Sequence, residues 1–248
     1  MSQSTVRASV LDPNEVDRAL VVTAHPDDVD FGAAATVALW TSQGIEVSYC
    51  VITDGQAGGF DPGLDRADMP RIRRAEQQAA AAKVGVGDVR FLGYVDGELR
   101  VSRSLIGDLV RVIRLVRPQR ILIQSPERNW ERLAPSHPDH LAGGEAATQA
   151  VFPGAGNRFA YSELLDEEGL EPWSPKELWL MEHSTTNHAL DVTDHFDAKI
   201  EAILCHQSQH PDPGRFREIM RAKLTATAAE YGFADGVLAE KFAVYPIP

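Results

Sequence analysis

The sequence has few cysteines, a deficit of basic residues and no long apolar run. Cys50 and Cys205 cannot build a disulfide framework, and both lie in apolar patterns that predict burial, which favours a reducing cytoplasm. The 24 basic residues face 36 acidic ones, and this net charge of −12 disfavours nucleic acid or an anionic membrane surface as a partner. No segment approaches the roughly 20 apolar residues that cross a bilayer, and residues 1–15 lack the apolar stretch of a signal peptide. We therefore expect neither a membrane protein, nor a secreted disulfide scaffold, nor a disordered chain.

What the sequence does contain is a regular alternation of short apolar runs and helical patterns. Runs rich in β-branched residues predict buried strands at 19–24, 46–53, 88–92, 120–124 and 177–182. Apolar residues at helical spacing predict helices at 31–43, 70–84, 103–116, 139–151, 195–207 and 215–231. This alternation predicts an α/β fold, with an open, mainly parallel sheet and helices on both of its faces.

The organisation of the chain indicates one domain. Its 248 residues are 44% hydrophobic and 24% charged, which is ordinary for a globular chain with a sizeable core. No internal repeat or low-complexity linker divides it. We expect a single domain over residues 1–248, with a core at about 19–210 and a variable C-terminal part.

Two short motifs carry the chemistry: HPDD at residues 25–28 and HPDH at residues 137–140. Each follows a predicted buried strand, the first directly and the second after a loop, and each precedes an alanine-rich helix. Proline suits the first position of a helix, so each motif is expected to start its helix there. In open α/β sheets ligands bind at the carboxyl ends of the strands, so both motifs point to that edge of the sheet.

The residue types in the motifs are those of a catalytic metal centre. Residues three apart share one face of a helical turn, which pairs His25 with Asp28 and, likewise, His137 with His140. Two imidazoles and a carboxylate are the ligands of a zinc ion that keeps an open position for water. Asp27 lies between two potential ligands and should point differently, as a general base beside such a water would. Whichever of His137 and His140 is not a ligand would be free to act as the general acid.

The tripeptide alone is weak evidence, because it occurs a third time at residues 210–212. That copy follows a predicted helix, and Pro213 stands where a further ligand would be needed, so we interpret it as a solvated turn. For either of the first two motifs taken alone, a turn with a helix N-cap is the competing structural interpretation. Their matched placement after strands of one sheet favours a functional site.

The AHPDD string after the first strand and the TDGQAGG string at the end of the second resemble the LmbE/PIG-L family of zinc-dependent N-acetylglucosaminyl deacetylases. The resemblance covers roughly residues 19–210, with the order and spacing of the motifs preserved. Further matches are Arg73-x-x-Glu76, Leu92-Gly93, Asp96-Gly97, Arg117-Pro118, SHPDH and His206-x-Ser208-Gln209. The family often has glutamate after the second aspartate of the first motif, where this chain has Val29 followed by Asp30.

The resemblance implies a metal centre and its ligands. His25, Asp28 and His140 match the family's zinc ligands, which implies one zinc ion per chain. Two histidines and one carboxylate also accommodate iron, cobalt or manganese.

The resemblance also implies roles for four other residues. Asp27 matches the general base. His137 matches the histidine that stabilises the oxyanion and protonates the leaving amine, and Asp139 could orient it. Arg73 matches an arginine that contacts the sugar. Apart from these four, His206 in the late motif is expected to serve packing or to support the site by contacting another site residue.

Residues and resemblance together predict a Rossmann-like metal-dependent hydrolase with its site at the carboxyl ends of the strands. Its substrate would be a small N-acetylated amino-sugar conjugate of the glucosaminyl type, from which it removes the N-acyl group. An amidase that cleaves the amide of thiol-sugar conjugates and a catalytically silent metal-binding module are the alternatives. The resemblance further implies that a homo-oligomer is common.

Overall fold

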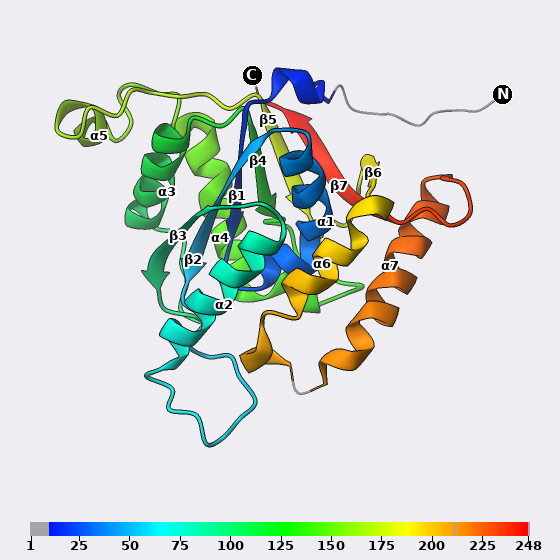
Figure 1. The fold of residues 1–248 in the computed structure, drawn as a ribbon. Helices are drawn as coiled ribbons and strands as arrows, with labels where there is room; N and C mark the ends of the chain where they lie inside the picture. The colour runs from blue at the N-terminus through cyan, green and yellow to red at the C-terminus, as the bar shows by residue number, and fades with distance from the viewer. Residues whose placement is uncertain (1–9, 211, 248) are drawn as a thin grey trace.

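The computed structural model describes residues 10–210 and 212–247, and its centre is one seven-stranded sheet (Figure 1). The strands are β1 Arg18–Thr23, β2 Glu46–Thr53, β3 Asp88–Tyr94, β4 Arg120–Gln124, β5 Glu177–Met181, β6 His188–Asp191 and β7 Ala239–Pro246. They are ordered β3-β2-β1-β4-β5-β7-β6. The first five are parallel, whereas β7 runs antiparallel to both β5 and β6. The predicted α/β fold with a mainly parallel sheet is confirmed.

Helices cover both faces of the sheet, as the alternation in the sequence predicts. They are α1 Asp28–Ser42, α2 Met69–Lys83, α3 Arg103–Val116, α4 Pro138–Gln149, α5 Ser162–Asp166, α6 Phe196–Ile203 and α7 Phe216–Glu230. Helices α1, α2 and α6 lie on one face and α3 and α4 on the other (Figure 1). None of the helices in the described residues is long and apolar enough to cross a membrane.

The central strands are buried on both sides, which explains their unbroken apolar runs. Along β1, Ala19 and Val21 face the core beneath α1, while Leu20 and Val22 face the core beneath α3 and α4. A strand covered on both faces needs no alternation of polar and apolar residues. The sheet is therefore a rigid platform whose carboxyl edge can hold side chains in place.

Differences from the predicted elements concentrate in the C-terminal part. The expected helix at 195–207 is shorter, because α6 ends at Ile203 and a 3₁₀ turn follows over Gln207–Gln209. Strands β6 and β7 were not predicted. The strand β7 contains the charged pair Glu240 and Lys241, which obscures its apolar pattern, although Phe242 is fully buried.

Candidate active site

The two motifs meet where the strand order of the sheet reverses direction. Strands β1 and β4 are neighbours, but the next strand in sequence after β1, namely β2, lies toward one edge of the sheet, and the next after β4, namely β5, lies toward the other edge. HPDD follows β1 directly, and HPDH lies at the end of the loop that follows β4. Such a reversal leaves a crevice at the carboxyl ends of the strands, where α/β proteins bind ligands. The predicted location of both motifs is thereby confirmed.

The first motif is a strained turn rather than the beginning of a helix. Asp27 has φ 93° and ψ −26°, in the left-handed region that non-glycine residues seldom adopt, and α1 begins only at Asp28. The expectation that Pro26 occupies the first helical position is therefore wrong, whereas Pro138 does occupy it in α4. The backbone N–H of Asp27 donates to Gln77 Oε1 at 2.8 Å, and this bond holds the turn. Backbone strain of this kind persists only where surrounding contacts impose it.

Three side chains of the motifs bring their ligand atoms together. His140 Nε2 lies 3.1 Å from Asp28 Oδ1 and 3.2 Å from His25 Nδ1, and His25 Nδ1 lies 3.4 Å from Asp28 Oδ2. A tetrahedral zinc ion with bonds of about 2.0–2.1 Å places its ligand atoms about 3.3 Å apart. The spacing of these atoms fits a metal ion held by His25, Asp28 and His140.

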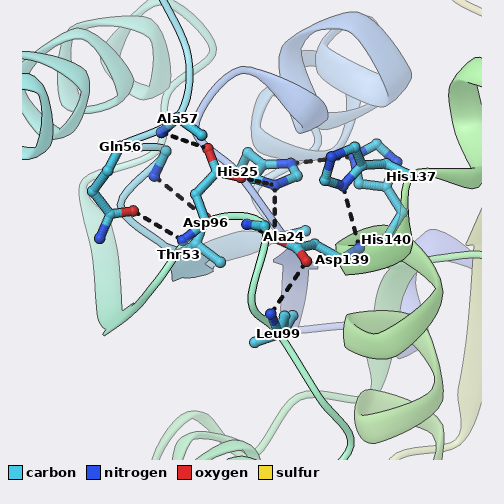
Figure 2. Close-up of polar contacts among 12 residues, drawn as sticks. Ala24, His25, Thr53, Gln56, Ala57, Asp96, Leu99, His137, Asp139 and His140 are labelled. Atoms are coloured by element: carbon cyan, nitrogen blue, oxygen red, sulfur yellow. Dashed lines mark hydrogen bonds and ion pairs between the residues drawn. The ribbon is translucent and has the colours of Figure 1, made fainter. Parts of the chain in front are cut away.

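Carboxylates surround the far side of the His25 ring. Its Nε2 lies 3.0 Å from Asp96 Oδ1 and 3.3 Å from Asp139 Oδ2, and Figure 2 shows the ring between Asp96 and the two histidines of the second motif. Burial lowers the pKa of His25, but the hydrogen bonds to Asp139, Asp28 and Asp96 outweigh it and raise the pKa to about 12. A metal-binding histidine usually donates its other ring N–H to a carboxylate, which fixes the tautomer.

Two other groups have ligand atoms close enough to bind a metal ion, namely His25 with His137 and His140, and His25 with Asp96 and Asp139. Both carboxylates also accept backbone N–H groups: Asp139 accepts that of Leu99, and Asp96 accepts that of Ala57 (Figure 2). Asp139 accepts the N–H of Gly97 as well. The Nδ1 side of His25 thus faces Asp28 and His140, while Asp96 and Asp139 contact its Nε2, and the ligand set stays a prediction.

The second motif differs from expectation in how Asp139 is used. Its carboxylate contacts His25 rather than orienting His137. The His137 ring is instead held by the backbone N–H of Asp139, which donates to Nδ1 at 3.2 Å. Burial, followed by the charges of His25 and His140, lowers the pKa of His137. His137 stands edge-on to His25, with ring centroids 4.9 Å apart, and both rings line one cavity.

Asp27 is held by a buried arginine on α2. Arg73 is 4% exposed, and its Nη2 donates to Asp27 Oδ2 at 3.1 Å and also to the carbonyl oxygen of Pro26. Its Nη1 donates to the carbonyl oxygen of Gly55 at 3.0 Å. Burial raises the pKa of Asp27 to about 6, and the charge of Arg73 opposes this rise. The sugar contact of Arg73 stays a prediction, because its observed partners belong to the protein itself.

The cavity in front of these groups has a volume of about 290 Å³. Residues of both motifs line it together with Arg73, Asp96, Ala134 and the loop residues Ala57 and Gly58. A carboxylate, an imidazole and a candidate metal centre thus face one space, which is the arrangement that hydrolysis of an amide requires.

Comparisons with known proteins agree with this geometry. Residues 20–151 match the PIG-L family, described as GlcNAc-PI de-N-acetylase. The chain is 31% identical to the diacetylchitobiose deacetylase of Thermococcus kodakarensis, over 90% of this chain and 80% of that protein. The chain belongs to the PIG-L family of deacetylases.

Two further relatives support this membership. The chain is 33% identical to the probable N-acetyl-α-D-glucosaminyl L-malate deacetylase 2 of Bacillus cereus, over 77% of this chain and 82% of that protein. The structure of N,N′-diacetylchitobiose deacetylase from Pyrococcus horikoshii superimposes with a TM-score of 0.83 at 31% identity, covering 94% of this chain and 85% of that one. The resemblance seen in the sequence is confirmed, and the enzyme class is that of the N-acetylglucosaminyl deacetylases, which are amidohydrolases.

The third HPD segment of this PIG-L protein is not the solvated turn that we expected. The ring of His210 packs against Phe31 and Phe216, with centroid distances of 5.2 and 4.6 Å, and is partly buried. Pro211 lies outside the described residues. His210 contributes no atom to the candidate metal cluster.

Sequence reasoning missed Asp96 and Gln77 as parts of the site. Asp96 belongs to an Asp-Gly pair that matches the family, and this was the signal that could have identified it. Gln77 follows Glu76 on α2, and nothing in the local pattern indicates that its buried amide reaches the turn at Asp27.

Proposed function

We propose that this protein removes the N-acetyl group from a small N-acetylglucosaminyl conjugate and that a zinc ion held by His25, Asp28 and His140 is required. The observation that carries the proposal is that these three side chains meet in a PIG-L family member and that His25 and His140 line one cavity with Asp27 and His137. A metal clamp alone would need neither a buried carboxylate nor a further imidazole beside the ligands, which argues against the silent binding module.

Zinc at this site would supply Lewis acidity, lowering the pKa of a coordinated water and polarising the amide carbonyl group. Asp27, held by Arg73, accepts the proton of the attacking water. His137, across the cavity, donates a proton to the sugar nitrogen as the carbon–nitrogen bond breaks. Asp96 and Asp139 keep the His25 ring in one orientation. The products are acetate and the free amine.

A panel of substrates tests this proposal. We expect the zinc-loaded protein to release free amine from at least one of diacetylchitobiose, an N-acetylglucosaminyl malate, an inositol glycoside and free N-acetylglucosamine. Protein treated with a chelator should release none, because Asp27 and His137 alone do not activate water sufficiently. Release only from a thiol-sugar conjugate in the same panel would favour the amidase alternative. If the protein with zinc bound released no amine from any member of the panel, the proposal would be contradicted.

The conjugated partner of the sugar, the homo-oligomer, the cytoplasmic location and the single domain over residues 1–248 stay predictions. Size-exclusion chromatography with light scattering measures the oligomeric state directly.

A further inference from the structure

The turn over residues 206–209 hydrogen-bonds to three segments that also carry active-site residues, namely α1, α2 and the loop after β2. It follows α6 and carries the His-x-Ser-Gln pattern of residues 206–209. His206 Nε2 donates to Asp30 Oδ2 at 2.7 Å, in the first turns of α1. The N–H and hydroxyl of Ser208 donate to the Glu76 carboxylate on α2, each at 2.7 Å. Gln209 Oε1 accepts the backbone N–H of Gly59 at 3.1 Å, in the loop after β2.

The contact of His206 continues as a chain of hydrogen bonds to Asp27. Asp30 Oδ2 also accepts Gln77 Nε2 at 2.9 Å, and Gln77 Oε1 accepts the backbone N–H of Asp27 at 2.8 Å. His206, Asp30 and Gln77 are all 0% exposed. Each bond along this chain joins buried polar groups, so breaking one leaves a further polar atom without a partner, as Asp30 Oδ1 and His206 Nδ1 already are within the described residues. The left-handed backbone of Asp27 is thereby tied to the late turn of the chain.

Gln209 contacts the loop after β2, whose residues Ala57 and Gly58 line the cavity. Gly58 lines the cavity, and a Cβ atom there would lie 2.4 Å from Gln209 Oε1 and 2.6 Å from Arg73 Nη1. A side chain at position 58 would therefore require Gln209 or Arg73 to shift. The glycine-rich loop therefore packs directly against Gln209 and Arg73, which hydrogen-bond to its backbone at Gly59 and Gly55.

We propose that the 206–209 turn is a positioning device of the active site with two separate branches. His206 sets the position of Asp27 through Asp30 and Gln77, and Gln209 sets the position of loop residues 57–59 beside the cavity. The proposal rests on the proposed function in one respect, namely that Asp27 is the general base. His206 and Gln209 act through other residues, and neither lines the cavity.

The two branches predict different kinetic signatures. His206→Leu removes the donor to Asp30, so kcat should fall by about 10–100-fold, the usual cost of losing a residue that supports a catalytic centre from behind, with KM unchanged. His206→Gln can still offer an amide N–H to Asp30, so most of kcat should return. Gln209→Leu releases loop residues 57–59, so KM should rise by about fivefold, the worth of one hydrogen bond, with kcat little changed. The control is Gln207→Leu, in the same turn, whose exposed side chain makes no hydrogen bond to the described part of the chain.

A double-mutant cycle with Asp27→Asn separates positioning from general loss of stability. If His206 acts through Asp27, His206→Leu should have no further effect on kcat in the Asp27→Asn background. Zinc content measured by mass spectrometry should stay at the wild-type level in every variant of this set. Additive effects on kcat, or equal losses in the Gln207→Leu control, would overturn the proposal.

Crystal structures decide the same question without any assay of activity. We expect Asp27 to leave its left-handed conformation in His206→Leu and in Gln77→Met, and to keep it in Gln78→Met, an exposed neighbour on α2. If His206→Leu does not fold, Gln77→Met alone tests the branch. An unmoved Asp27 in a folded Gln77→Met variant would overturn the proposal. Wild-type protein that releases no amine would instead count against the proposed function, and the structures would still test the positioning.

Discussion

The Asp27→Asn variant should keep its zinc and lose about 10²–10⁴-fold in kcat, the range that a positioned general base contributes. The asparagine oxygen can still accept the hydrogen bond from Arg73, but it cannot take a proton from water. Zinc should remain because the three ligand side chains are unchanged. The measurements are kcat on the best substrate of the panel and metal content by mass spectrometry.

The matched control for this variant is Asp61→Asn, in the exposed loop after β2. Asp61 Oδ1 accepts the nearby N–H of Gly63, and asparagine preserves that turn. Its kcat should equal that of the wild type. If Asp27→Asn turned over substrate at the wild-type rate, Asp27 would be excluded as the base.

The His25→Ala variant should lose both the metal and all measurable hydrolysis. Its Nδ1 faces Asp28 and His140 and its Nε2 contacts Asp96 and Asp139, so the substitution removes one of the three proposed ligands and its contacts with both carboxylates. Zinc stoichiometry and amine release are measured on the same samples. Zinc should raise the melting temperature of the wild type and leave that of His25→Ala unchanged, since only a folded state that binds the ion is stabilised by it.

Two further variants keep this test informative. His140→Ala removes a different ligand and should give the same pair of losses, which covers the case in which His25→Ala does not fold. His195→Ala, a half-buried histidine in the turn before α6, should keep zinc and activity. Full zinc stoichiometry in folded His25→Ala would contradict the assigned ligand set.

The location of the site followed from the sequence because parallel strands bring distant segments to one edge. Residues 25–28 and 137–140 are far apart in the chain, but each follows a strand with an unbroken apolar run, and both runs lie in one sheet. Continuous burial of β1 and β4 made these strands easy to predict, and prolines at 26, 118 and 126 marked the turns beside them. Chemistry-bearing residues placed after such strands can then meet without any knowledge of the packing.

What the sequence could not show is which side chains meet around the motifs. Asp139 lies two residues from His137, so a local interpretation pairs the two, but the helical direction of α4 turns its carboxylate toward His25. The bond between His206 and Asp30 joins residues separated by 176 positions, and no local pattern encodes it. The left-handed turn at Asp27 is likewise imposed by a tertiary contact, because aspartate has no strong preference for this conformation.

The C-terminal strands illustrate a second limit. The strand β7 inserts between β5 and β6, and its Glu240 side chain is buried against Lys199 of α6, at 2.8 Å. A buried ion pair of this kind makes a core strand look like a surface segment in sequence. Only the structure shows that Lys199 is the partner of Glu240.

Titration of zinc into the metal-free protein, with amine release followed at each addition, tests the central claim most directly. Our account predicts that activity is absent at the start, rises in proportion to bound zinc and reaches its maximum at one ion per chain, because His25, Asp28 and His140 form one site. Activity that is already complete in the metal-free protein, or that stays absent for every N-acetylglucosaminyl substrate when the site is filled, would contradict it.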